Sequence, residues 1–267
     1  MVYEHLWGES ELKRPLRIGL IAEGKTELGF SVAPPIIAQD GGHPIPSEQE
    51  GALHTLIRRE LVEAGFPNCQ FVQRHPSTKE WKNREFRTGH TILDRKYVAQ
   101  AVIAWKSHEI DMVVICADSD DQVDGRSASL QGAMMTARAN HLDIHEKPIP
   151  DRSAGGLAIK NFETWLLADN QAVVALLAVS LPELPANLET LPGDRENEEC
   201  ARFVLDRAIE ESAYRLEDTK REFRIRWELA GVVELAQIKA HCQQGYVVFA
   251  DALQAAAGAV IASQQDS

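Results

Sequence analysis

Two aspartates separated by one residue follow the most apolar segment of the chain. The segment spans residues 112–117, and Asp118 and Asp120 come directly after it. Hard cations such as Mg²⁺ prefer oxygen ligands, and two carboxylates at this spacing reach one ion when the chain turns behind a strand. Asp121 and Asp124 follow closely and are further candidate ligands. The spacing predicts a divalent-metal site; a solvated, acid-rich turn that caps the next helix is the alternative.

A further carboxylate stands at the end of a second apolar segment. Residues 16–22 read LRIGLIA, and Glu23 and Gly24 follow them. With the aspartates, Glu23 would bind metal or transfer a proton to a leaving oxygen. Glu27 lies one helical turn further on and would support it. We expect Glu23 and Lys25 to form the catalytic pair.

These patches resemble those of a known family. Residues 21–27 (IAEGKTE) are similar to the strand–Glu–Gly start of TOPRIM domains, and residues 113–121 (VVICADSDD) to their DxD-bearing strand. Together with residues 159–169 (IKNFETWLLAD) and, less closely, 236–253 (AQIKAHCQQGYVVFADAL), they resemble a TOPRIM-like family of uncharacterised bacterial proteins related to OLD-type nucleases. The third patch is the more specific one, because generic TOPRIM domains lack it.

The resemblance implies roles for particular residues. Glu23 would be the general acid or base, and Asp118 and Asp120 would bind Mg²⁺ or Mn²⁺, with Glu163 standing near them as a further ligand. Family members often sit beside an ABC-type ATPase in gene pairs related to phage defence, so an ATPase is the implied partner. Cys242 lies in the closing segment, which departs from the family pattern, and no role is carried over to it.

Glu163 also has a purely structural explanation. A glutamate at the start of a helix is stabilised by the helix dipole. Asn161 stands two residues earlier and is suited to cap that helix. Both explanations of Glu163, as a metal ligand and as a helix-start residue, stay open at this point.

A nucleotide-binding motif offers a competing interpretation. Residues 19–26 (GLIAEGKT) match the P-loop pattern G-x-x-x-x-G-K-[ST], and Asp118 would then be a Walker-B acid. A P-loop requires its first glycine to end a strand, whereas Gly19 lies inside the apolar run. Residues 20–22 would also place apolar side chains where a phosphate should sit. We prefer the metal site; a P-loop NTPase and a non-catalytic TOPRIM-fold binding subunit are the alternatives.

A basic segment interrupts an otherwise acidic chain. The whole chain has a formal net charge of −12, yet residues 74–96 carry seven basic and three acidic side chains. Trp81 and Phe86 are interleaved, so the segment is suited to bind phosphates and to stack on a base. A solvated loop or a contact with an acidic partner is the alternative. The predicted nucleic-acid-binding residues are Arg74, Lys79, Lys82, Arg84 and Arg87.

A second basic run, residues 220–226, alternates with acids, and we expect an exposed helix face there.

The partner we expect for this protein is nucleic acid, DNA in preference to RNA. The net charge argues against a protein that coats DNA by bulk electrostatics, but a local basic patch suffices for phosphate contact.

The elements that must position these residues alternate between strand and helix. This order predicts an α/β fold with a TOPRIM-like (Rossmann-like), mostly parallel sheet flanked by helices. Ligands collect at the carboxyl ends of such strands, which is where Glu23 and Asp118 stand. The predicted strands are 16–22, 66–74, 111–121 and an edge strand at 156–161. The predicted helices are 26–38, 48–64, 90–107, 127–141 and 163–177.

The chain divides into two predicted parts. A TOPRIM-like metal-binding domain spans residues 14–178, and a helical C-terminal region, residues 198–262, packs on it. The Pro-rich stretch 180–199 reads as a linker or long loop.

Four isolated cysteines and no CxxC pair indicate a reducing compartment and no zinc ribbon. We find no signal peptide and no window of about 20 apolar residues, and therefore expect a cytoplasmic protein without membrane contact.

Overall fold

The two segments predicted as buried strands are neighbours in one sheet. In the computed structural model, β1 (Leu16–Ile21) and β3 (Met112–Asp118) pair in parallel. β2 (Cys69–Val72) pairs with the other side of β1, and β4 (Ser153–Ala158) pairs with β3. The order is β2-β1-β3-β4 and every pairing is parallel, which confirms the predicted α/β class and the edge position of β4.

The structure describes residues 14–29, 50–72, 89–105, 110–142, 149, 151–194, 196–212 and 221–265. The predicted helix 26–38 falls only partly within these ranges. Its described part, α1 (Gly24–Leu28), begins earlier than predicted, and the residue after it, Gly29, has a φ of 71°. The predicted nucleic-acid-binding residues at positions 74–87 lie outside the described residues.

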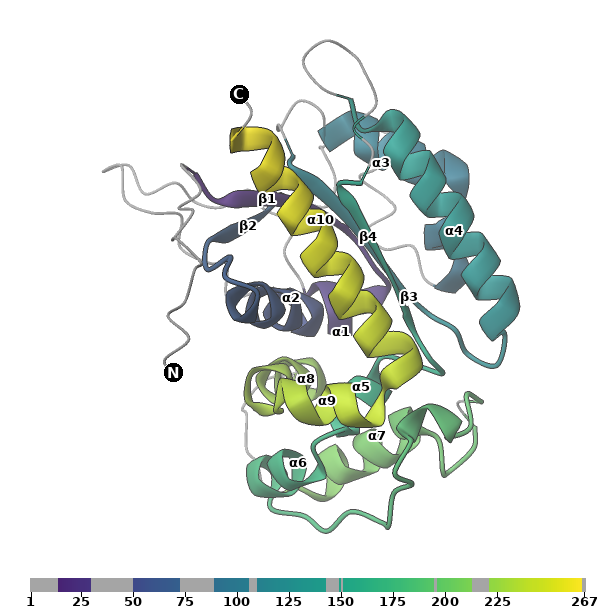
Figure 1. Ribbon diagram of the computed structural model, residues 1–267. Helices are drawn as coiled ribbons and strands as arrows, with labels where there is room; N and C mark the ends of the chain where they lie inside the picture. Colours follow the sequence, from purple (N-terminus) through teal and green to yellow (C-terminus); the bar gives the residue numbers. More distant parts are fainter. Residues whose placement is uncertain are drawn as a thin grey trace, which may run out of the picture.

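Helices cover both faces of the sheet (Figure 1). α2 (Ala52–Glu63) and α10 (Val248–Gln265) share one apolar cluster with the sheet, and α3 (Arg95–Trp105) and α4 (Val123–Asn140) share the other. Neighbouring side chains of β3 alternate between the two clusters, because successive strand residues point to opposite faces. Burial on both faces explains why this strand is continuously apolar.

Two predicted helices are divided in the structure. The segment 163–177 forms α5 (Glu163–Leu167) and α6 (Asn170–Leu177), so the single helix predicted there is wrong. The break is stabilised by Asp169, whose carboxylate accepts hydrogen bonds from the Ala172 and Glu234 backbone N–H groups at 3.1 and 3.0 Å. The segment 90–107 begins as a 3₁₀ turn (Gly89–Leu93) before α3.

The remaining helices gather at the end of the sheet where β1 and β3 finish (Figure 1). They are α7 (Ala201–Glu211), α8 (Arg221–Val232), α9 (Leu235–His241) and a π-helical turn (Gln243–Val247) that leads into α10. α8 packs on α1 and α2, and α10 packs on β4. One apolar cluster therefore runs from the sheet through these helices, and a boundary at residue 178 stays a prediction.

The Pro-rich segment predicted as a linker or long loop is anchored to the helices beside it. It contains a 3₁₀ turn (Leu188–Thr190) with a buried glutamate, Glu189. The Glu189 carboxylate accepts hydrogen bonds from the backbone N–H groups of Gln244, at 2.8 Å, and Gly245, at 2.5 Å. These bonds satisfy donors at the start of the π-helical turn, which have no partner within the helix.

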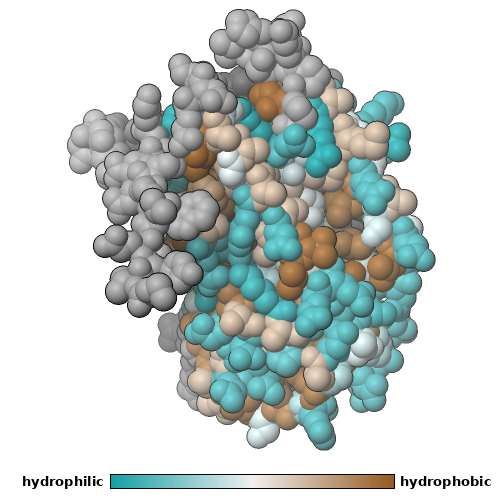
Figure 2. Space-filling model, viewed as in Figure 1, coloured by the Kyte–Doolittle hydropathy of each residue, from teal (hydrophilic) through white to brown (hydrophobic). Residues whose placement is uncertain are grey.

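The segment Gln243–Ser263 is long and apolar enough to cross a membrane by length and composition alone, although no such segment was expected. Somewhat less than half of its most apolar window, 44%, is buried inside the protein. Its helix lies on the face of the molecule shown in Figure 2, where hydrophobic and hydrophilic residues are mixed. Its helix packs on β4, β3 and α2, where Phe249 and Leu253 are fully buried. A core helix passes the same test of length and composition.

We predict that Gly156→Ala destabilises the protein by about 1–3 kcal/mol, because the core here is already filled. A Cβ at Gly156 would lie 2.6 Å from the Phe249 ring, where β4 meets α10. Gly125→Ala is the matched control: it lies in α4 with nothing within 4 Å of the added carbon. We expect that change to be neutral or to stabilise by up to about 1 kcal/mol. Urea unfolding measures both, and equal effects would contradict the packing of α10 on β4.

Candidate functional site

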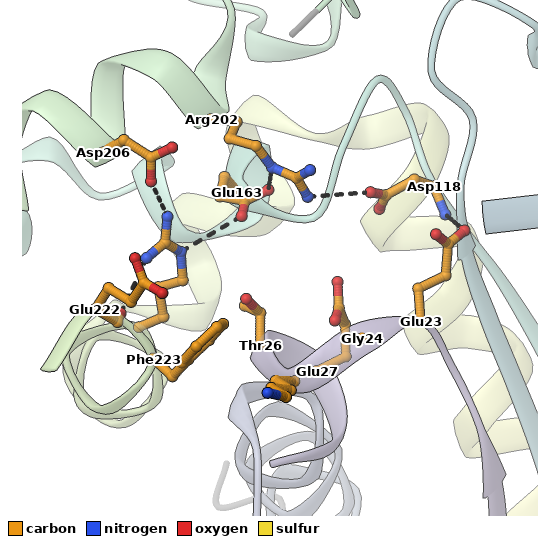
Figure 3. A pocket seen from close by; sticks show the side chains of 12 residues that line it. Glu23, Gly24, Thr26, Glu27, Asp118, Glu163, Arg202, Asp206, Glu222 and Phe223 are labelled. Carbon is orange, nitrogen blue, oxygen red and sulfur yellow. Dashed lines mark hydrogen bonds and ion pairs between the residues drawn. The ribbon is translucent and has the colours of Figure 1, made fainter. Parts of the chain in front are cut away.

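A cavity of about 260 Å³ opens at the carboxyl ends of β1 and β3 (Figure 3). Its walls come from the sheet, from α1 and α5, and from α7 and α8 of the C-terminal region. Acidic side chains dominate the lining, and two arginines stand among them. The lining residues are Glu23, Gly24, Lys25, Thr26, Glu27, Asp118, Glu163, Arg202, Asp206, Glu222, Phe223 and Arg226.

Glu23 and Asp118 are 95 positions apart in the chain and are joined directly. The Asp118 backbone N–H donates a hydrogen bond to Glu23 Oε1 at 3.1 Å. Gly24 follows with a φ of 59°, a left-handed conformation that glycine adopts without strain, and this turn starts α1 behind the strand. The structure thus brings together two acids that the sequence places at separate strand ends.

Glu27 and Glu163 complete a group of four buried carboxylates. Glu27 comes from α1, and Glu163 is the first residue of α5 with 1% of its surface exposed. In Figure 3 the Glu27 side chain rises into the space below Glu163, and Asp118 points into the same space from the strand. We name Glu23, Glu27, Asp118 and Glu163 the acidic quartet.

Two arginines from the C-terminal helices, Arg202 and Arg226, each form an ion pair with one oxygen of Glu163. Arg202 Nε lies 3.2 Å from Glu163 Oε2, and its Nη2 lies 3.7 Å from Asp118 Oδ2. Arg226 Nε lies 3.4 Å from Glu163 Oε1 and its guanidinium also pairs with Asp206. Like-charged carboxylates repel strongly when water is excluded, and these cations offset part of that repulsion.

The pKa values of Glu27 and Asp118 reflect this crowding. The pKa of Glu27 is raised from 4.5 to about 8, chiefly by burial and then by the charges of Glu163 and Glu23, against the lowering effects of a backbone hydrogen bond and Arg202. Burial, Glu27, Glu23 and Glu163 hold the pKa of Asp118 well above its usual value. Burial lowers the pKa of Arg202, but Glu163 and Asp118 outweigh it and keep that pKa above its usual value.

The second aspartate of the DxD motif does not line the cavity. Asp120 has a φ of 48°, and its carboxylate lies 3.5 Å from the guanidinium of Arg126 in α4. Asp121 pairs with Lys160 at 2.8 Å, and accepts a hydrogen bond from the Gly193 N–H at 3.2 Å. The turn after β3 therefore directs Asp118 into the cavity and the next two acids toward basic partners outside it.

Lys25 lines the mouth of the cavity with an exposed side chain. Its Nζ lies 5.9 Å from the centre of the Phe223 ring in α8. The Trp227 indole N–H donates hydrogen bonds to the carbonyls of Lys25, at 3.2 Å, and Thr26, at 3.0 Å, which fixes α8 against α1. Lys25 is thus in place to meet a ligand that enters the cavity.

The backbone over residues 19–26 does not form the loop that a P-loop requires. Gly19 lies inside β1 and pairs with both neighbouring strands, and a Cβ there would lie 2.5 Å from the Trp105 ring. β1 continues to Ile21, and α1 starts only three residues later, at Gly24. Residues 20–22 are buried core residues and present no cradle of N–H groups to a phosphate.

The sequence did not identify Arg202 and Arg226 as residues of the site. The prediction that residues 220–226 form an exposed helix face is wrong at Arg226, which is 4% exposed, and is confirmed at Arg224. The signal was present in the spacing: Arg226 precedes the buried Leu229 and Ala230 by three and four residues, so it shares their helix face. Nothing in the local sequence marks Arg202, because its partners lie far away in the chain.

Comparison of the chain with protein-family models, curated proteins and solved structures found no match. The geometry of the site therefore carries the functional argument.

The carboxylate oxygens of the acidic quartet are chemically suited to bind a divalent cation. Carboxylate oxygens are the ligands that Mg²⁺ and Mn²⁺ prefer. Glu163 Oε2 is buried and makes its ion-pair contact with Arg202 without a directed hydrogen bond, so it retains capacity for a cation. Among the described residues, no three His, Cys, Asp or Glu side chains already stand close enough to hold one ion. Binding would require these side chains to close in.

We predict that Glu27→Gln flattens the pH dependence of stability. A folded-state pKa of about 8 lies above the ordinary 4.5, so the folded protein binds the proton more tightly than the unfolded chain. This stabilisation is complete below about pH 4.5 and is lost as the pH rises through about 8. Between these limits the unfolding free energy of the wild type should fall by a few kcal/mol more than that of Glu27→Gln.

Urea unfolding across the pH range measures this difference. Glu210→Gln, which removes an exposed carboxylate of α7, is the control and should keep the wild-type slope. If Glu27→Gln also keeps that slope, the carboxylate is not held in the crowded, buried setting described above.

Proposed function

We propose that the protein is a divalent-metal-dependent nuclease with a TOPRIM-like fold. It would use Mg²⁺ or Mn²⁺ to hydrolyse phosphodiester bonds in nucleic acid, DNA in preference to RNA. The observation that carries the proposal is the convergence of four carboxylates in one cavity, at the carboxyl end of a parallel sheet. Ligands bind at this end in open α/β sheets. An acidic cavity of this kind gains from a cation, because its members repel one another.

The members of the quartet suit different parts of phosphodiester hydrolysis. A divalent ion bound there would acidify a water molecule and stabilise charge on the leaving oxygen. Asp118 and Glu163 would hold the ion. Glu23 fixes the Asp118 backbone and, by the family resemblance, would serve as general acid or base. Glu27, whose pKa is raised to about 8 by burial and by its acidic neighbours, is a second candidate to protonate a leaving oxygen.

The partners and setting of this activity are proposed from the sequence. The basic residues at positions 74–87 would contact the phosphates of nucleic acid. The resemblance to OLD-related proteins implies an ABC-type ATPase partner and a role linked to phage defence, in the cytoplasm. A non-catalytic subunit that uses the same fold to dock a partner is the alternative, and it differs from the nuclease in cleaving nothing.

We predict that Asp118→Asn and Glu163→Gln each lower Mn²⁺-dependent nicking of plasmid DNA by at least about 100-fold, the usual scale for loss of a charge-stabilising or proton-transferring group. Calorimetric Mn²⁺ binding should weaken in parallel. Asp120→Asn should lower nicking far less, because the Asp120 carboxylate pairs with Arg126 outside the cavity. Asp121→Asn, on the exposed side of the same turn, is the control.

Thermal unfolding of the same variants shows whether each of them still folds. Asp118→Asn removes a carboxylate that its buried, acidic neighbours repel, so the variant should be at least as stable as the wild type at alkaline pH. Wild-type protein that binds no Mn²⁺ in the calorimeter would exclude the metal-dependent nuclease. Wild-type protein that binds Mn²⁺ but leaves DNA and RNA uncut would support the non-catalytic alternative.

Lys25→Ala separates the nuclease from a nucleotide-hydrolysing protein. Because Lys25 is exposed at the cavity mouth, its loss should leave Mn²⁺ affinity within about twofold and lower nicking by roughly 10-fold or more. Lys25→Arg is the conservative control and should restore part of the activity. A wild type that binds Mg-ATP, with binding lost in Lys25→Ala, would instead support the P-loop interpretation.

A further inference from the structure

The two arginines of the cavity differ in how they are held. Arg226 has 5% of its side chain exposed, pairs with Asp206 as well as Glu163, and donates to the Glu222 carbonyl at 2.9 Å. Two of these three acceptors belong to the C-terminal helices and lie outside the acidic quartet. Arg226 is thereby fixed as part of the wall, whatever occupies the cavity.

Arg202 is held by the acidic quartet itself. Its ion pairs are with Glu163 at 3.2 Å and Asp118 at 3.7 Å, and 22% of its side chain is exposed. The contact with Asp118 is long for a charge-assisted hydrogen bond, which is usually below about 2.9 Å. In Figure 3 its guanidinium extends from α7 between the two carboxylates. Arg202 therefore stands at the place that a cation held by Asp118 and Glu163 would take.

The position of Arg202 has no explanation in helix stability. It is the second residue of α7, an 11-residue helix that starts at Ala201 after the N-cap Cys200. A cation in the first turn opposes the positive end of the helix dipole. Within the described residues, its favourable interactions come from Glu163, Asp118 and Glu27, which belong to other elements. This points to a role in the cavity.

A divalent ion and a guanidinium favour different anionic partners in such a cavity. A divalent ion carries twice the charge and binds carboxylate oxygens, whereas a guanidinium matches the geometry of phosphate with two parallel N–H groups. A cation bound to Asp118 and Glu163 would weaken their hold on Arg202. The same guanidinium, already partly exposed at the cavity, would then be available to an anion.

We propose that Arg202 is the phosphate-binding residue of this site and that it competes with the divalent cation for Asp118 and Glu163. The inference rests on the proposed nuclease function and deepens it. It assigns recognition of the nucleic-acid phosphate to a C-terminal helix, α7, in addition to the basic segment. Arg226, in contrast, is a positioning residue that keeps Glu163 in the wall.

Arg202→Ala tests both halves of the proposal. Removing a competing cation should tighten Mn²⁺ binding by roughly 3- to 10-fold in calorimetry. Affinity for a short DNA duplex, measured by fluorescence anisotropy with Ca²⁺ in place of Mn²⁺, should fall about 10-fold, as for loss of one charge-assisted phosphate contact. Nicking with saturating Mn²⁺ should fall about 100- to 1,000-fold. Arg202→Lys should recover part of the DNA affinity.

Arg207→Ala is the matched control. Arg207 lies on the same helix, is 66% exposed at its side chain and pairs with Glu211 on the surface. All three measurements should stay at wild-type values in this variant.

Two results would overturn the role of Arg202 alone. Weaker Mn²⁺ binding in Arg202→Ala would mean that the arginine holds the carboxylates in place and does not compete. Unchanged DNA affinity would mean that it does not contact phosphate, whether or not the wild type cleaves DNA. Wild-type protein without Mn²⁺ binding would instead remove the proposed function, and the role of Arg202 with it.

Discussion

Repulsion among four buried carboxylates is the constraint on which the rest of this structure depends. Glu23 from the turn after β1, Glu27 from α1, Asp118 from β3 and Glu163 from α5 all line one cavity. This repulsion raises the free energy of the folded protein where water is excluded. The arrangement is stable only because neighbouring cations and bound protons offset the repulsion. Arg202 and Arg226 supply part of the positive charge from the C-terminal helices. Those helices are therefore required by the electrostatics of the site as well as by packing.

Packing at the sheet end and the chemistry of the site are coupled through a few contacts. The Asp118 N–H binds Glu23, which ties β3 to the turn after β1. Trp227 binds the backbone of α1 and Arg226 binds Glu163, so α8 fixes two walls of the cavity at once. The cavity is thus a product of the whole fold, in which separate segments supply acids and countercharges.

Local sequence predicted the sheet well, because a strand buried on both faces must be continuously apolar and β1 and β3 both are. It also singled out Glu23, Asp118 and Glu163, because the ends of strands and helices can be predicted from the sequence, and these three residues line one cavity. It could not place Asp120, whose positive φ turns its carboxylate toward Arg126. Nor could it find Arg202, because its partnership with Glu163 and Asp118 exists only after α7 docks against the sheet end.

The most direct test of the central claim is anomalous diffraction from crystals soaked in Mn²⁺. The account predicts a single strong anomalous peak inside the cavity, within coordinating distance of carboxylate oxygens of Asp118 and Glu163, with the Arg202 guanidinium moved away from them. A peak at the turn formed by Asp120 and Asp121, or a soaked crystal without any peak in the cavity, would contradict it.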